Sequence, residues 1–322
     1  MKAISQRLVI VTPVFEDAEA SARLFSELFK TFGSEVFVVA VDDGSVQAPL
    51  SIASLEAAGV SGVVLKLRRN VGHQRAIAIG LSHVAGRVRP DQLTVVMDSD
   101  GEDLPSSIAD LVEALDRGQV DVVVARRKSR VETWRFKAFY AVYKRFFNVM
   151  TGRAISFGNF MVMNPMALKR LVSMQELSIH VAAAVLASKL RTQAVAIARG
   201  PRYAGRSKMN FVGLALHGFK ALMVFAEDVL VRVGIFCAVF AGLTVLAGVV
   251  ALGLKLTGFA TPGWFSVSLG ILTLMFLQSG ALALMALMTL MLTGVVRGGT
   301  VTTAVAYEGF VEQVIETRMA PS

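Results

Sequence analysis

The chain has 322 residues, of which 54% are hydrophobic, and its formal net charge is +9. That hydrophobic share excludes a wholly soluble protein, so we expect part of the chain to lie in lipid. A single cysteine, Cys237, lies in an apolar run and excludes both a disulfide framework and a cysteine-based metal site. The basic residues cluster beside the apolar runs, which favours an anionic membrane surface over nucleic acid as the partner.

In the first part of the chain, apolar segments of strand length alternate with segments of helix length. This alternation predicts an α/β fold with a doubly wound, mostly parallel sheet, in which ligands bind at the carboxyl ends of the strands. The sequence contains neither the glycine fingerprint of a dinucleotide-binding fold nor a P-loop. The expected strands are 7–12, 35–41, 63–67, 93–97 and 120–125, and the expected helices are 16–32, 73–84 and 105–117.

An acidic stretch directly follows the expected strand at 93–97. Carboxylates this close repel one another and resist burial, so the arrangement is stable mainly with a cation among them, for which Mg²⁺ or Mn²⁺ is suited. A solvated loop that caps the next helix is the alternative, and a lone D-x-D motif is a weak signal. A second acidic pair follows the strand at 35–41, at the same predicted sheet edge. The acidic residues are Asp98, Asp100, Glu102 and Asp103 in the first stretch, and Asp42 and Asp43 in the second.

Two almost uncharged runs, 229–253 and 264–296, follow the α/β part. Each is longer than the roughly 20 residues that a helix needs to cross a bilayer. Glycine and proline between them predict a short connection, hence a helical hairpin that returns the chain to its starting side. Arg232 and Arg297 flank the hairpin on that side, so the positive-inside rule places the α/β part in the cytoplasm.

Two further segments are candidates for helices that lie at the bilayer surface. Residues 134–149 place aromatic side chains on one face and basic side chains elsewhere, a pattern that suits an interfacial helix but is also found in protein cores. Residues 210–227 are expected to form a second such helix, leading into the first span. The polar segment 310–317 has no assigned function, and a short helix is one alternative for it.

Several sequence motifs occur in a fixed order. Four of them, VTPVFE (11–16), VDDGS (41–45), RNVG (69–72) and DSDGED (98–103), resemble in that order the family 2 glycosyltransferases of the GT-A fold. The later motifs GNF (158–160) and RYAGRSK (202–208), together with the two spans, resemble the polyprenyl-phosphate branch of that family. This branch includes dolichol-phosphate mannose synthase and the GtrB-like enzymes. The resemblance covers nearly the whole chain.

The resemblance assigns roles on the donor side. It implies that Mg²⁺ or Mn²⁺ is held by the D-x-D pair and that a nucleotide sugar, linked to UDP or GDP, is bound beside it. The implied metal ligands are Asp98, Asp100 and Glu102, and the implied nucleotide-binding residues are Pro13, Glu16, Asp42, Asp43, Asn70 and Gly72.

On the acceptor side, the resemblance implies a polyprenyl phosphate such as undecaprenyl phosphate. A phosphate monoester, with its second pKa near about 6, is already largely ionised at neutral pH, so it needs positive charge more than a general base. Direct displacement would then invert the anomeric centre. The implied phosphate-binding residues are Arg127, Arg130, Arg202, Arg206, Ser207 and Lys208, and the implied catalytic residues are Asp98, Asp100, Asp103 and Arg127.

Three departures and two alternatives remain. Relatives commonly carry Gln where this chain has Glu102, and Asp where it has Asn159; residues 178–189 do not align with the branch's usual basic segment. One alternative is a glycosyltransferase that uses a lipid hydroxyl, with Asp103 as base. The other is a membrane-anchored sugar-nucleotide-binding scaffold without turnover.

The expected organisation is that of a multi-pass protein of the bacterial inner membrane. Small residues spaced along the first span also suggest a homo-oligomer. The expected parts are a cytoplasmic catalytic domain (1–208, with an interfacial helix at 134–150), a juxtamembrane helix (209–228), two membrane spans (229–255 and 264–296) and a cytoplasmic tail (297–322).

Overall fold

A computed structural model describes residues 4–127, 134–154, 157–203, 211–259, 261–298 and 307–318. The chain divides into two compact units, each of which is described by itself. Unit 1 comprises 1–137, 155–224 and 301–322, and unit 2 comprises 138–154 and 225–300.

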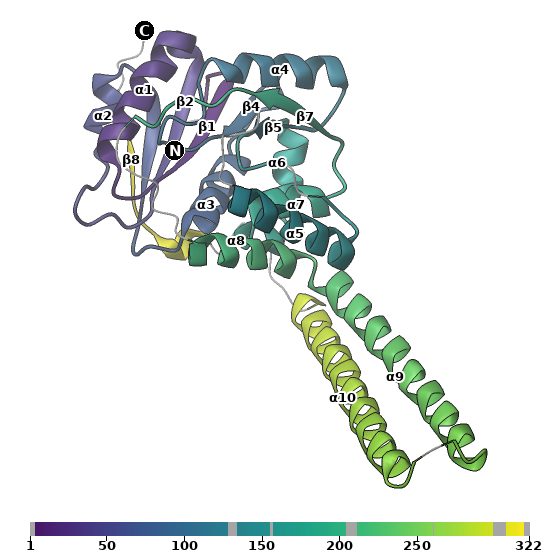
Figure 1. The fold of residues 1–322 in the computed structure, drawn as a ribbon. Coiled ribbons are helices and arrows are strands. Elements are labelled where there is room, and N and C mark those ends of the chain that lie inside the picture. Colours follow the sequence, from purple (N-terminus) through teal and green to yellow (C-terminus); the bar gives the residue numbers. More distant parts are fainter. Residues whose placement is uncertain are drawn as a thin grey trace. The chain divides into compact units, whose positions relative to one another are not determined.

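A mixed sheet forms the centre of unit 1 (Figure 1). Its strands are β1 (Leu8–Val14), β2 (Val36–Asp42), β3 (Ser61–Leu67), β4 (Leu93–Val96), β5 (Val122–Arg127), β6 (Met161–Met163), β7 (Thr192–Ile197) and β8 (Val311–Glu316). Their order is β7-β5-β6-β4-β1-β2-β3-β8. Strand β6 is antiparallel to β4 and β5, and β8 is antiparallel to β3, whereas the other pairs are parallel. The expected doubly wound, mostly parallel sheet is therefore confirmed.

Helices cover both faces of this sheet. Consecutive strand residues point to opposite faces, and because the central strands are mostly apolar, both faces are apolar and need to be covered. In β1, Val9 and Val11 pack with α3, α6 and α7, whereas Leu8 and Ile10 pack with α1, α2 and α4. Helix α3 lies so close to the sheet that a Cβ atom at Gly80 would come within 2.5 Å of Val11 Cγ1. The helices of unit 1 are α1 (Ala18–Phe32), α2 (Ala53–Ala57), α3 (His73–Ala85), α4 (Ser107–Gly118), α6 (Pro165–Val172), α7 (Val181–Ala187) and α8 (Phe211–Val224), with 3₁₀ turns η1 (Gly33–Glu35), η2 (Gln175–Ser178) and η3 (Tyr307–Phe310).

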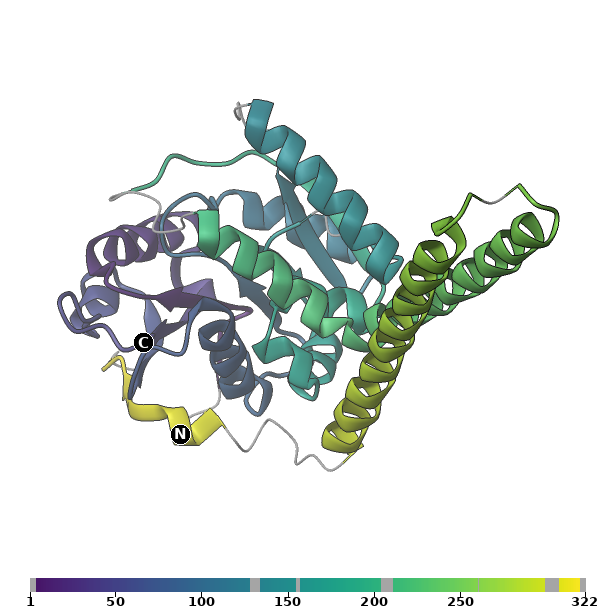
Figure 2. The ribbon, with the colours of Figure 1, turned by 60° about the horizontal axis from the view of Figure 1, so that its bottom comes forward.

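Unit 2 contains two long apolar helices, α9 (Ala226–Leu256) and α10 (Trp264–Gly298). They lie side by side in both views (Figures 1 and 2). Their most apolar windows have mean hydropathies of 2.6 and 2.0, and only 17% and 11% of the residues in those windows are buried. A core helix of a soluble protein would be mostly buried. Both helices thus have the length, composition and outward-facing apolar surface of membrane spans.

Helix α5 (Trp134–Thr151) carries its described apolar side chains on more than one side. In unit 2, Phe147 is buried against Phe225, with ring centroids 5.9 Å apart, while Val142, Phe146 and Val149 are exposed. In unit 1, α8 exposes Leu216, Phe219 and Met223, spaced three and four residues apart on one face. Exposed apolar stripes of this kind suit a bilayer surface. The interfacial role of both helices stays a prediction.

The C-terminal segment was expected as a polar tail or a short helix, but it forms η3 followed by β8. In both views this yellow segment lies along the edge of unit 1, next to α3 and β3 (Figures 1 and 2). Backbone pairing runs from Val63 opposite Glu316 to Leu67 opposite Val311. Strand β8 therefore covers an edge that β3 would otherwise present to solvent.

Two histidines are buried in unit 1. Burial, helped by nearby Arg87, lowers the pKa of His83 to about 3. Burial, helped by His217 at an Nε2–Nε2 distance of 3.1 Å, likewise lowers the pKa of His180 to about 3. Both are therefore neutral in the folded protein at neutral pH.

These histidines are expected to make stability fall in mild acid. The unfolded chain binds a proton at each below the ordinary pKa of 6.5, whereas the folded chain does not until about 3. Their contribution is complete above pH 6.5 and is lost below it, by about 1.4 kcal/mol per pH unit for each. His180→Asn should make stability depend less on pH, because it removes one of the two titrating imidazoles. Asn can still cap α7 by accepting from the Ala183 N–H. The measurement is the unfolding midpoint between pH 7.5 and 5. A slope equal to that of the wild type would contradict the assignment.

Candidate functional site

The acidic stretch forms a tight loop after β4, at the carboxyl edge of the sheet. The Asp98 N–H donates to Asp103 Oδ2 at 3.0 Å, and the Glu102 N–H donates to Asp100 Oδ1 at 3.0 Å. Gly101 has a φ of +88°, and a Cβ atom there would come within 2.6 Å of the Tyr203 ring. The loop thus needs glycine at 101, and Asp103, which is 7% exposed, is engaged in holding its shape.

A basic segment from 199 to 203 runs beside this loop. Gly200 N–H donates to the Glu102 carbonyl at 3.0 Å, and Tyr203 N–H donates to the Asp100 carbonyl at 2.8 Å. Arg202 reaches Asp100 Oδ2 at 2.8 Å and Glu102 Oε1 at 3.2 Å. These contacts bring the D-x-D loop and a predicted phosphate-binding arginine together, although they are about 100 residues apart.

Each carboxylate oxygen of Glu102 forms an ion pair with a guanidinium group. Oε1 pairs with Arg202, and Oε2 pairs with Arg199, which lies outside the motifs of the sequence. The Glu102 side chain is only 5% exposed, so its charge depends on these two partners. To bind a metal as well, it would have to share or release one of them; the ligand role of Glu102 stays a prediction.

Glu102→Gln is expected to lower the free energy of unfolding by about 3 kcal/mol, because two partly buried guanidinium groups lose their counter-charge. Thermal or denaturant unfolding of the purified protein measures this effect. Glu113→Gln is a suitable control, since Glu113 forms an exposed ion pair with Arg117 on α4. An unchanged stability would contradict the role of the ion pairs. A rise in the metal concentration for half-maximal transfer would support the additional role as a ligand.

His73, the first residue of α3, lies beside the first aspartate of the D-x-D pair. Its Nε2 is 3.2 Å from Asp98 Oδ1 and 3.1 Å from Asn159 Nδ2. Burial opposes protonation of His73, but the charge of Asp98 and the hydrogen bond to it outweigh that effect and raise the pKa of His73. The position of His73 directly after the RNVG motif was the available signal for its involvement. Asn159 is thus at the site, with an amide where the resemblance implies a carboxylate.

The acidic residues on the donor side hold loops in place. Glu16 accepts hydrogen bonds from the N–H groups of Val46, Gln47 and Ala48, at distances from 2.6 to 3.1 Å. Asp43 accepts from the N–H groups of Val71 and Gly72 at 2.7 and 2.9 Å, and burial raises its pKa in spite of these bonds. These bonds join the ends of β1, β2 and β3 into one rigid edge.

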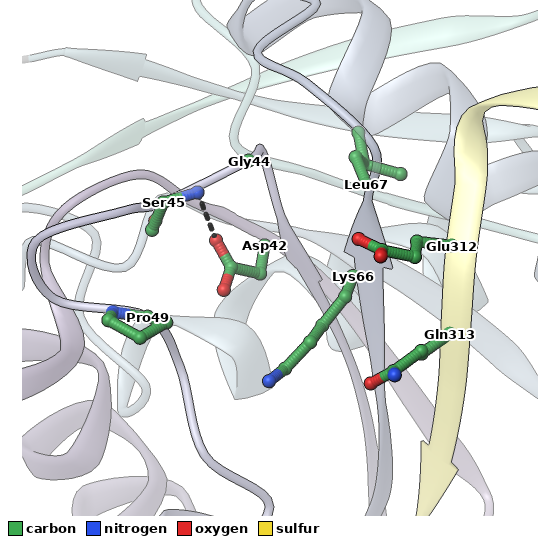
Figure 3. Close-up of a pocket in the computed structure, with 8 residues that line it drawn as sticks. All are labelled: Asp42, Gly44, Ser45, Pro49, Lys66, Leu67, Glu312 and Gln313. Atoms are coloured by element: carbon green, nitrogen blue, oxygen red, sulfur yellow. Dashed lines mark hydrogen bonds between the residues drawn. The ribbon is translucent and has the colours of Figure 1, made fainter.

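A cavity of about 280 Å³ opens at this edge (Figure 3). It is lined by the loop after β2, the end of β3 and two residues of β8. Of the predicted nucleotide-binding residues, only Asp42 is among its lining residues; Pro13 is buried in β1, and Asn70 is exposed after β3. The lining residues are Asp42, Gly44, Ser45, Pro49, Lys66, Leu67, Glu312 and Gln313.

The predicted phosphate-binding residues are only partly described. Arg202 lies at the acidic loop, as given above. Arg127 ends β5, but its side chain lies outside the described part of the structure. Arg130, Arg206, Ser207 and Lys208 lie outside the described residues altogether. Their roles stay predictions.

The D-x-D loop provides part of the ligand set that a divalent ion requires. Within the described ranges, no three Asp, Glu, His or Cys side chains are grouped so as to enclose a metal by themselves. Mg²⁺, however, is commonly held by one or two carboxylates, with substrate phosphates and water completing its shell. Asp98 and Asp100 provide two such carboxylates, and Asp100, like Glu102, would have to share its charge with Arg202. The residues present therefore fit an ion that is shared with a phosphorylated substrate.

Comparisons with known proteins show the family to which the chain is similar. The family model "Glycosyl transferase family 2" matches residues 9–177, more than half of the chain. An undecaprenyl-phosphate 4-deoxy-4-formamido-L-arabinose transferase from Enterobacter sp. (strain 638) is 32% identical over 46% of this chain and 45% of that protein, so the match spans about half of the relative's length. The uncharacterized glycosyltransferase YkoT from Bacillus subtilis (strain 168) is 26% identical over 84% of this chain and 83% of the length of YkoT.

Solved structures show more distant likenesses. Glucosyl-3-phosphoglycerate synthase from Mycobacterium tuberculosis, in complex with Mn²⁺, UDP-glucose and phosphoglyceric acid, gives a TM-score of 0.48 at 16% identity, over 71% of this chain and 80% of that chain. The structure of S. aureus TarS 1–349 gives a TM-score of 0.46 at 15% identity, over 71% of this chain and 65% of that chain.

Proposed function

Because the chain belongs to glycosyl transferase family 2, we propose that it transfers a single sugar from a UDP- or GDP-sugar to a polyprenyl phosphate such as undecaprenyl phosphate. One observation carries the proposal: Arg202 lies against the D-x-D loop in a chain that also has two apolar helices. The undecaprenyl-phosphate transferase among the relatives supports this class of acceptor. The positive charge that flanks the spans supports a site on the cytoplasmic face of a bacterial inner membrane.

On the donor side, Asp98 and Asp100 would hold Mg²⁺ or Mn²⁺. When bound, this ion supplies Lewis-acid stabilisation of the negative charge that develops on the departing diphosphate. The chain's own part is to fix the two carboxylates: the bond from Asp98 N–H to Asp103 and the bond from Glu102 N–H to Asp100 keep the loop in one conformation. Asp103 is therefore proposed as a positioning residue of the loop.

On the acceptor side, Arg202 would bind the lipid phosphate, with Arg127, Arg130, Arg206, Ser207 and Lys208 as further predicted contacts. A guanidinium group suits phosphate because its planar fork can donate two parallel hydrogen bonds. The phosphate oxygen attacks the anomeric carbon, the bond from that carbon to the diphosphate oxygen breaks, and the nucleoside diphosphate leaves. No proton needs to be removed from the nucleophile, and an α-linked donor gives a β-linked product.

The proposal is tested with the purified full-length protein in lipid nanodiscs. Polyprenyl phosphate, Mn²⁺ and a panel of UDP- and GDP-sugars are supplied, and both nucleotide release and sugar in the lipid fraction are measured. We expect one donor to give both products. A protein that binds a nucleotide sugar but never releases nucleotide would contradict the enzyme assignment and favour the binding scaffold. Transfer to a polyprenol but not to its phosphate would favour a lipid hydroxyl acceptor.

A further inference from the structure

The C-terminal segment is fixed to unit 1 at both of its ends. Near its start, the Phe310 carbonyl accepts from Arg68 N–H at 3.0 Å, and Arg75 lies 5.7 Å from the centroid of the Phe310 ring. At its end, Thr317 N–H donates to the Gly62 carbonyl at 3.0 Å, and Gly62 N–H donates to Thr317 Oγ1 at 3.1 Å. Strand β8 is thus a part of the sheet and has a defined register beside the cavity.

An irregularity in this register directs two neighbouring side chains to the same cavity. Lys66 is opposite Gln313 and Leu67 is opposite Val311, which leaves Glu312 as an extra residue in β8. In a regular strand, Glu312 and Gln313 would point to opposite faces, but a bulge redirects side chains. Figure 3 shows both side chains extending from β8 on the side of Lys66, and both line the cavity.

The other polar groups of the cavity already have partners within the protein. Asp42 is 3% exposed and accepts from Ser45 N–H and Leu50 N–H, each at 3.0 Å. The hydroxyl of Ser45 accepts from Glu16 N–H at 2.9 Å. Within the described ranges, by contrast, the side chains of Lys66, Glu312 and Gln313 form no hydrogen bond or ion pair. Donors and acceptors for a ligand therefore come from β3 and β8.

The charge and size of the cavity indicate which part of a donor it suits. Its two carboxylates, Asp42 and Glu312, disfavour a diphosphate, which has its own site at the D-x-D loop. A volume of about 280 Å³ is just below the roughly 300 Å³ at which small-molecule sites begin, so it suits one part of a nucleotide. A nucleobase presents adjacent hydrogen-bond donors and acceptors. Gln313 both donates and accepts, Glu312 accepts, and Lys66 donates.

We infer that Glu312 and Gln313 contact the base of the donor nucleotide and determine which nucleotide is preferred. This inference rests on the proposed function. It assigns part of the donor site to a segment that follows the second apolar helix in the sequence.

Nucleotide affinities of the full-length protein test this inference. Calorimetric titrations with UDP, GDP, CDP and inorganic pyrophosphate are compared for the wild type, Glu312→Gln and Gln313→Ala. Each substitution is expected to lower the affinity for the preferred nucleotide about tenfold, which is the effect of one lost hydrogen bond in a binding site. The ratio of this affinity to the affinities for the other nucleotides should fall as well. Pyrophosphate affinity should not change. Glu316→Gln is a matched control, because Glu316 is exposed on the same strand but does not line the cavity.

The outcomes separate this inference from the function on which it rests. If the wild type binds none of the nucleotides, the proposed function fails, and the inference fails with it. If the wild type prefers one nucleotide and both variants keep its affinity and its preference over the others, only the inference is overturned. The ratio of affinities does not depend on the folded fraction, so partial unfolding of a variant cannot imitate the expected change.

Discussion

Asp100→Asn is expected to lower the turnover of sugar transfer by on the order of a thousandfold, because the transition state loses much of the electrostatic stabilisation of the leaving diphosphate. Asp100 combines two functions that an amide cannot replace: it is a proposed anionic ligand of the metal, and it is the counter-charge of Arg202 at 2.8 Å. Turnover is measured as radiolabelled sugar that enters the lipid fraction at saturating donor.

The control for this experiment is Asp110→Asn, since Asp110 is exposed in the first turn of α4. It should keep turnover within about twofold, as expected for a surface substitution. Binding of the nucleotide without metal should also be retained in Asp100→Asn, because the cavity does not include the D-x-D loop. Transfer at a near-normal rate in Asp100→Asn would show that the D-x-D loop is not the site of leaving-group stabilisation.

Arg202→Ala is expected to lower kcat/KM for the lipid phosphate by on the order of a hundredfold, since removing one member of a poorly hydrated charge pair typically costs several kcal/mol. Arg202→Lys should recover only part of this loss, because an ammonium group cannot make the bidentate contact. The readout is the dependence of the rate on lipid phosphate at saturating donor.

Arg170→Ala is the matched control, as Arg170 is exposed on α6. A stability measurement accompanies the kinetics, because Arg202 also pairs with Glu102. A folded Arg202→Ala protein that uses the lipid phosphate as well as the wild type would exclude Arg202 from acceptor binding. That result would also favour a lipid hydroxyl as the acceptor.

Much of the fold could be predicted because it follows from short-range patterns. The apolar run before Asp98 and the acidic residues after it place a loop at the carboxyl end of β4, and the same logic applies to β2 and Asp42. The strands and helices expected up to residue 125 agree with the structure to within a few residues. Helix α1 begins at Ala18 and not at Glu16, because the Glu16 carboxylate binds the backbone at 46–48.

The candidate site could be predicted only in part. The motifs of the sequence include both the D-x-D loop and Arg202, but nothing local indicates that Arg202 would reach Asp100, or that Arg199 would pair with Glu102. His73 directly follows the RNVG motif, but only the position of α3 brings its Nε2 to 3.2 Å from Asp98 Oδ1. Such contacts depend on how the helices and loops pack at the sheet edge, which no periodicity in the sequence encodes.

The sequence by itself determined the α/β class, the acidic edge and the two apolar helices, because each arises from the hydrophobicity and charge of neighbouring residues. Only the tertiary structure decided the partners of Glu102 and the place of the C-terminal segment. Strand β8 is only six residues long, and three of them, Glu312, Gln313 and Glu316, are polar, so its apolar pattern is too short to predict a strand by itself. It becomes a strand because the free edge of β3 offers it backbone hydrogen-bond partners, and that edge exists only once the sheet has formed.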